Sequence, residues 1–207
     1  MKLPRLFAAL SLLAAFSLPA QASVVCTDWS SISSGVLTQG ANVSNVSLSG
    51  NVHSYDNGSP YYYQYPASFG NLAPSDLIRV AGVGAFTLNF DAPVTDLYLA
   101  LVSVGQPGLP VTYSFDSSFS VFSSGPGAWG NGTYSVSDND FTGREFNGVL
   151  FFSGTFSSLS FNISPAEYWH GFNIGVAEVA QVPEPGSLAL VALSLGLLGA
   201  AARRRMR

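Results

Sequence analysis

Residues 86–102 read FTLNFDAPVTDLYLALV, and this stretch decides the class of fold. At 86–90, phenylalanine and leucine alternate with polar residues, which is the period of a strand that buries one face. The tripeptide DAP at 91–93 predicts a turn. The apolar run at 97–102 predicts a central strand that is covered on both faces.

Strand patterns recur on both sides of this stretch. The further segments are 43–48, 61–65, 111–115, 119–122, 133–136, 149–152, 159–163 and 172–179. Strands spaced by about 8–12 residues, with Gly, Pro, Asn or Asp between them, are typical of an antiparallel sandwich. The sequence therefore predicts an all-β domain over residues 23–181, an antiparallel, jelly-roll-like β-sandwich of nine or so strands.

The N-terminus has the pattern of a secretory signal peptide. Lys2 and Arg5 precede an apolar run at 6–18, and Ala20 and Ala22 make a small-x-small cleavage site. We expect residues 1–22 to be a signal peptide helix that directs export through the Sec machinery and is removed by signal peptidase. The alternative is an uncleaved anchor, but the run is short for a span of about 20 residues.

The C-terminus, residues 182–207, reads VPEPGSLALVALSLGLLGAAARRRMR. Proline keeps the motif at 182–187 extended, and 188–202 predicts an apolar transmembrane helix. Those 15 residues make about 22 Å of helix, which is marginal for a hydrocarbon core of about 30 Å. The arginines of the tail, at 203–207, favour the cytoplasmic side and leave the body of the protein outside.

This tail resembles the PEP-CTERM sorting signal of Gram-negative bacteria, which is also labelled ice-binding protein C-terminal domain. The resemblance implies recognition by a membrane-embedded exosortase, transient retention in the inner membrane, and release to the cell surface or its exopolysaccharide. It implies a processing motif and a cytoplasmic retention cluster. These comprise Val182, Pro183, Glu184 and Pro185 in the motif, and Arg203, Arg204, Arg205 and Arg207 in the cluster. A permanent tail anchor is the alternative.

The charge of the body excludes one class of partner. Between residues 23 and 181, eleven acidic side chains face two basic ones, Arg79 and Arg144, which gives a net charge of about −9. Such a surface repels phosphate backbones, so we expect no nucleic-acid partner. The single cysteine, Cys26, cannot form an internal disulfide, so the core must stabilise the domain.

Few residues offer chemistry. The two histidines and one cysteine do not form a metal-binding cluster, and no cofactor is expected. Asp138 and Asp140 are candidates for a calcium loop, and the alternative is a solvated turn. We expect His170 to be a core or edge residue bonded to backbone. Glu145 and Glu167 could act as a glycosidase pair, but eleven acids guarantee some such pair.

Aromatic side chains are the candidates for carbohydrate contact, because sugar rings stack on them. These candidates are Tyr61, Tyr63, Tyr65, Trp129 and Trp169. The alternative is that they fill the core. The sequence thus predicts an exported, non-enzymatic surface or matrix protein associated with exopolysaccharide. A polysaccharide-binding module and a secreted glycoside hydrolase are the alternatives.

Overall fold

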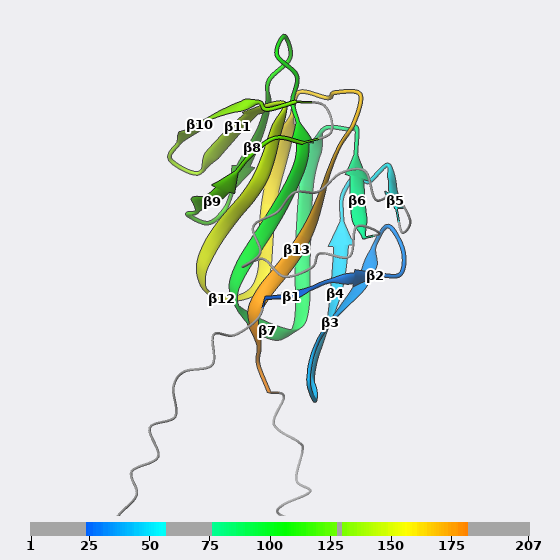
Figure 1. Ribbon diagram of the computed structural model, residues 1–207. Coiled ribbons are helices and arrows are strands. Elements are labelled where there is room, and N and C mark those ends of the chain that lie inside the picture. The colour runs from blue at the N-terminus through cyan, green and yellow to red at the C-terminus, as the bar shows by residue number, and fades with distance from the viewer. Residues whose placement is uncertain (1–23, 57–75, 128–129, 182–207) are drawn as a thin grey trace, which may run out of the picture.

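The computed structural model describes residues 24–56, 76–127 and 130–181, and every regular element in them is a β-strand (Figure 1). The thirteen strands pair antiparallel in one sheet. They are β1 Val25–Cys26, β2 Asp28–Trp29, β3 Ser34–Gln39, β4 Asn42–Ser49, β5 Ser54–Asp56, β6 Leu77–Val80, β7 Gly84–Val104, β8 Val111–Phe115, β9 Ser120–Ser124, β10 Thr133–Ser137, β11 Asp140–Arg144, β12 Phe146–Ser164 and β13 His170–Val179. The all-β prediction is confirmed, while the sandwich arrangement stays a prediction.

Several predicted features fall outside the described residues. They are the signal peptide helix, the processing motif, the transmembrane helix and the arginine cluster, together with Tyr61, Tyr63, Tyr65 and Trp129. Within the parts of the chain that the structure describes, no helix has the length and apolar character to cross a membrane.

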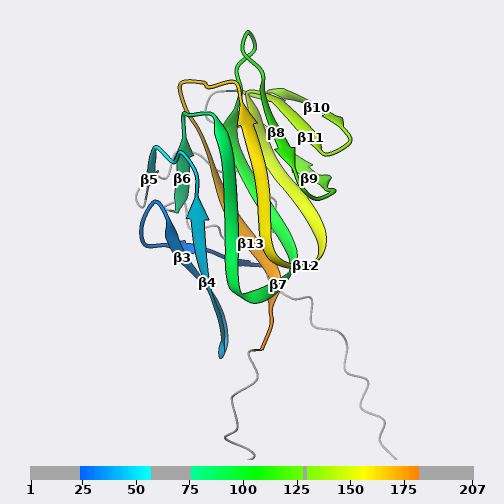
Figure 2. The same ribbon diagram turned by 180° about the vertical axis from the view of Figure 1, so that it is seen from behind.

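Two long strands, β7 and β12, organise the sheet. They pair along nearly their whole lengths, from Ile163 opposite Gly84 to Phe146 opposite Val104. Each strand changes its outer neighbour along the way. The first part of β7 pairs with β4 and the second part with β13, whereas β12 pairs first with β9 and then with β8. Figure 2 shows β3 and β4 beside one part of β7.

The exchange of neighbours divides the strands into two groups. The first contains β9, the 146–156 part of β12, the 94–104 part of β7, β13, β1, β6 and β5. The second contains β10, β11, β8, the 158–164 part of β12, the 84–90 part of β7, β4, β3 and β2. Register shifts in β12, on either side of Phe156, lie between the two groups, where a bulge bends a strand.

The predicted turn at 91–93 is wrong, because these residues continue β7. The Asp91 carboxylate accepts hydrogen bonds from the backbone N–H of Asn45 at 2.6 Å and from its side chain, so β4 takes up the polar group. Pro93 lies where the pairing passes from β4 to β13, and its carbonyl accepts the N–H of Ala180 at 2.9 Å. A proline is tolerated there because no ladder bond needs its missing N–H.

The same correction applies to 149–152 and 159–163, which were predicted as two strands and form the single strand β12. The prediction for 97–102 is correct. That part of β7 lies between β12 and β13, and its residues are buried except for the half-buried Tyr98. On one face, Ala100 packs with Val149 and the partly buried Cys26.

Aromatic rings from the two groups of strands contact one another. Phe115 on β8 contacts Phe152 on the first part of β12, with ring centroids 5.0 Å apart. Phe161, on the later part of β12, meets Phe172 on β13 at 5.8 Å. Both pairs meet edge to face, which is a favoured geometry for buried aromatic rings.

β13 runs from one end of the domain toward the other. It starts at His170, beside the loops at one end of the molecule, and leads the chain out at the opposite end after Val179 (Figure 1). Ten residues of strand span about 30 Å. Because β1 pairs with β13 at Val176 and Gly175, the N-terminal segment lies toward the same end as the departing C-terminal chain.

Candidate functional site

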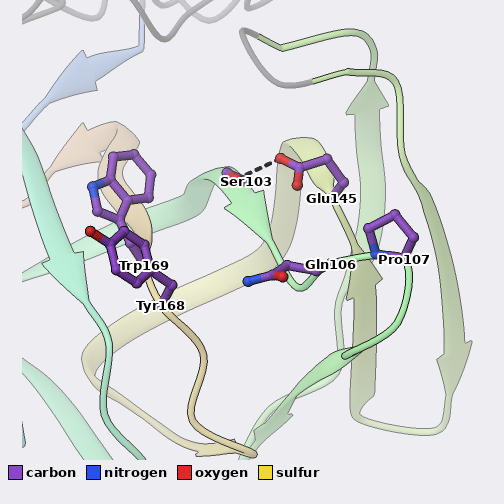
Figure 3. Close-up of a pocket in the computed structure, with 6 residues that line it drawn as sticks. All are labelled: Ser103, Gln106, Pro107, Glu145, Tyr168 and Trp169. Carbon is purple, nitrogen blue, oxygen red and sulfur yellow. Dashed lines mark hydrogen bonds between the residues drawn. The ribbon is translucent and has the colours of Figure 1, made fainter.

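A pocket of about 290 Å³ opens at the end where β13 begins. Three connections build it: the end of β7 with the turn that follows, the link between β11 and β12, and the segment before β13. Its lining residues are Ser103, Gln106, Pro107, Glu145, Tyr168 and Trp169. Figure 3 shows Tyr168 and Trp169 on one side, with Ser103 and Gln106 facing them and Glu145 behind.

Glu145 and Ser103 are held in an unusual backbone conformation. Their φ angles are +60° and +54°, in the left-handed region that residues with a β-carbon seldom adopt. Each such residue costs on the order of 1–3 kcal/mol and needs support from its surroundings. Backbone strain of this kind clusters at functional sites, so it directs attention to this pocket.

Hydrogen bonds supply that support. The Ser103 hydroxyl donates to Oε1 of Glu145 at 2.6 Å, and the Ser103 N–H donates to Oδ1 of Asn147 at 2.9 Å. The amide of Asn147 donates to the Glu145 carbonyl at 3.1 Å, and the Glu145 N–H donates to the Gly105 carbonyl at 2.9 Å. The carboxylate is therefore fixed before any ligand arrives.

Gly105 is the one position in this turn where glycine is required. Its φ is +73°, and a β-carbon there would collide with the carbonyl oxygen of Gly143. Its N–H donates to Oε1 of the buried Glu167 at 2.9 Å. Gly105 thereby joins the turn after β7 to both glutamates, since its carbonyl accepts the N–H of Glu145.

The two aromatic residues differ in exposure. Tyr168 is 89% exposed, whereas Trp169 is half-buried. The Arg79 guanidinium lies 5.4 Å from the centre of the Trp169 ring, at the distance of a cation–π contact. Arg79 is itself paired with Asp56, with Nη2 and Oδ2 2.9 Å apart. These contacts orient the indole, while the tyrosine is left accessible to a ligand.

A second group of polar residues is buried next to the pocket. Nδ1 of His170 lies 2.6 Å from Oε1 of Glu167, and both residues are buried. Among the described residues, neither ring nitrogen has a hydrogen-bond partner of good geometry, so the expectation of a bond from His170 to the backbone is wrong. Burial, and next the charge of Glu167, hold the pKa of Tyr113 well above its usual value.

The other predicted candidates lie elsewhere. Asp138 and Asp140 are exposed in the hairpin between β10 and β11, where Asp138 has a φ of +52°. In the described ranges, no three His, Cys, Asp or Glu side chains gather as metal ligands. The candidates Trp169 and Glu145 do line the pocket, but Ser103, Gln106 and Tyr168 were missed. The positive φ angles that mark this site have no signature in the sequence.

The fold and the pocket define an all-β domain that carries a preformed, aromatic-lined site far from its C-terminal exit. The C-terminal tail carries a sorting signal, because residues 181–205 match the PEP-CTERM protein-sorting motif. The resemblance of the tail to this signal is thereby confirmed, and it supports an exported protein sorted by an exosortase. No curated protein and no solved structure matches the chain.

Proposed function

We propose that this protein is a non-enzymatic component of the cell surface or extracellular matrix that associates with exopolysaccharide through the pocket. In this proposal residues 1–22 direct export and are removed, and 188–202 hold the precursor in the inner membrane with the arginines inside. An exosortase then cleaves near 183–185. The sorting motif at 181–205 supports this route.

We further propose that the two groups of strands are the layers of a jelly-roll-like sandwich. The support is that ring pairs such as Phe115 with Phe152, and Phe161 with Phe172, join one group to the other. The bulges of β12 would be the places where this strand crosses between layers.

The observation that carries the functional proposal is the position of the pocket relative to the tail. β13 separates the pocket from Val179, near the end of the described chain, by about 30 Å, so a domain held by its C-terminus at the membrane would turn the pocket outward. Its lining suits a sugar: Tyr168 and Trp169 offer ring faces, and Gln106 and Glu145 offer hydrogen-bonding groups for hydroxyls.

The glycoside hydrolase alternative requires two carboxylates flanking one scissile bond, about 5–9.5 Å apart. Glu145 lines the pocket, but Glu167 is 7% exposed and is engaged by Gly105 and His170. This arrangement favours binding over hydrolysis. A polysaccharide that stays intact when incubated with the protein would support binding. Release of reducing ends by the wild-type protein, abolished in Glu145→Gln, would support the hydrolase.

The processing route and the association are tested on protein from its native cells. Intact mass of the surface-purified protein should place its C-terminus near 183–185, and retention of Arg207 would defeat exosortase cleavage. The mature protein should co-sediment with the cells' own exopolysaccharide. Tyr168→Ala should weaken this association about ten-fold, the loss of one stacking contact of about 1.4 kcal/mol.

A control variant is available in Phe122→Ala. Phe122 is 43% exposed on β9, its ring contacts Tyr98 and Phe151, and it is not among the described residues that line the pocket. It should leave co-sedimentation unchanged. Absence of co-sedimentation by the wild-type protein, or equal losses in the two variants, would refute a role for the pocket in exopolysaccharide association.

A further inference from the structure

We infer that the pocket binds a protonated amino sugar, such as a glucosamine unit of a partly deacetylated polysaccharide. This inference rests on the proposed function and names the ligand of the same site. Three features of the pocket carry it: its charge, the orientation of the Glu145 carboxylate, and its size.

The charge of the pocket is negative. Glu145 is the acidic residue among the six that line it, and Arg and Lys are absent from that lining. Arg79 stands next to Trp169, but its charge is matched by Asp56 at 2.9 Å. The body at 23–181, with these residues included, carries a net charge of about −9. A cationic ligand is therefore attracted, and a uronate or sulfated sugar is repelled.

The orientation of Glu145 leaves one oxygen for a ligand. Oε1 accepts the hydroxyl of Ser103, and in Figure 3 the second oxygen is turned away from Ser103, to the side of Gln106. An ammonium group at that oxygen would form a charge-assisted hydrogen bond. Because Ser103 and the backbone of Gly105 already fix Glu145, little side-chain freedom is lost on binding.

The aromatic side reinforces this choice of ligand. Tyr168 and Trp169 lie across the pocket from Glu145 (Figure 3). Aromatic rings attract a cation and can also cover the apolar face of a sugar ring. A plain alkylammonium would interact only with the negative charge of the pocket, and a neutral sugar would only stack on the aromatic rings. An amino sugar can make both interactions.

The size of the pocket sets the length of chain it can hold. A volume of about 290 Å³ is at the small end of ligand pockets, which run from about 300 to 1,000 Å³. It accommodates about one sugar ring, and the rest of a polymer chain would lie outside it. The pocket therefore selects a chain end or a single deacetylated unit along a polysaccharide.

Isothermal titration of the mature, natively processed protein tests the inference. The ligands are a β-1,4-linked glucosamine tetramer, the fully N-acetylated tetramer and a uronic acid tetramer. The glucosamine tetramer should bind about ten-fold more tightly than the acetylated one, the difference between a charged and a neutral hydrogen bond. The uronic acid tetramer should show no binding. Raising the pH until the sugar amine is neutral should abolish the preference.

Two matched variants separate the pocket from the general acidity of the domain. Glu145→Gln keeps the shape and the acceptor for Ser103 but removes the charge, so the ten-fold preference should disappear. Glu178→Gln removes the same charge from an exposed site near the far end of β13 and should retain the preference. Unchanged thermal unfolding of both proteins would show that they are folded.

Failure of this inference can be told from failure of the proposed function. Equal affinities for the two glucosamine-type tetramers, no binding of either, or equal effects of the two substitutions would overturn the amino-sugar inference. If the protein still co-sediments with its own exopolysaccharide in a manner that depends on Tyr168, the proposed function stands without it. If the protein binds the glucosamine tetramer but does not co-sediment with its own exopolysaccharide, only the proposed exopolysaccharide association would be overturned.

Discussion

Asn173 on β13 ties the N-terminal segment to the sheet, and its replacement by alanine tests how that segment is held. Its side-chain oxygen accepts the indole N–H of Trp29 at 2.9 Å and the backbone N–H of Ile174 at 2.7 Å. Asn173 and Trp29 are each 2% exposed, so water cannot replace the lost acceptor. With two buried donors left unpaired at about 1.5 kcal/mol each, Asn173→Ala should lower the free energy of unfolding by about 3 kcal/mol.

A double-mutant cycle isolates the bond to the indole. Trp29→Phe removes the donor, and Asn173 still accepts from Ile174, so no polar atom of that pair is stranded. The double variant should therefore be less destabilised than the sum of the single variants by about 1.5 kcal/mol. Urea unfolding of the mature protein measures all four free energies.

The control is Asn162→Ala, the same substitution at an exposed position of β12, which should change stability by less than about 0.5 kcal/mol. Additive effects of Trp29→Phe and Asn173→Ala would show that the indole has no energetic link to the amide. That result would refute the assignment of Asn173 as the residue that fixes β2 against β13.

Three further predictions concern titratable residues. Tyr113→Phe should leave stability unchanged or raise it by about 1 kcal/mol, because no described residue hydrogen-bonds the buried hydroxyl; a loss above that size would contradict this reading. Burial raises the pKa of Asp91, but hydrogen bonds, led by the Asn45 side chain, outweigh it and lower the pKa. The ionised Asp91 carboxylate therefore stabilises the folded protein above the unfolded pKa of about 4, and this contribution is lost as the pH falls through the lower folded pKa. In urea unfolding at decreasing pH, the free energies of unfolding of the wild type and of Asp91→Asn should converge. Burial, and next the charge of Asp76, raise the pKa of Cys26 to about 12. Iodoacetamide at neutral pH should therefore alkylate Cys26 far more slowly in the folded protein than in the urea-unfolded protein. Equal rates would refute the burial of the thiol.

Local patterns predicted β4, β8, β9, β10, β13 and parts of β7 and β12, because alternation reports which side chains face a core. They missed the strands β1, β2, β3, β5, β6 and β11. They also failed where two strand segments are joined without a turn. Residues 91–93 have the composition of a turn, and only the partners on β4 and the chain after β13 make them part of β7. The register shift of β12 between Phe152 and Thr155 contains Gly154, whose φ is +120°, and a glycine inside a strand is a common sign of a bulge. Which strands pair on either side of it is decided by the tertiary structure.

The site was predictable in part. Trp169 and Glu145 were singled out as an aromatic and as an acid, which are properties of a residue type. Their placement beside Ser103 and Tyr168 depends on three connections that are distant in the chain. The carboxylate pair of Glu145 and Glu167 was a guess from composition, and the fold gives these two residues different partners.

The sequence by itself determined the sorting motif of this exported protein and the class of its fold. A sorting motif is a short contiguous stretch of sequence and strand periodicity is local, so both can be identified without a fold. Only the tertiary structure decided where the pocket lies and how Glu145 is held. Strain at φ +54° and +60° persists because contacts from β7, β12 and the turn between β7 and β8 converge on it, and no local sequence encodes that convergence.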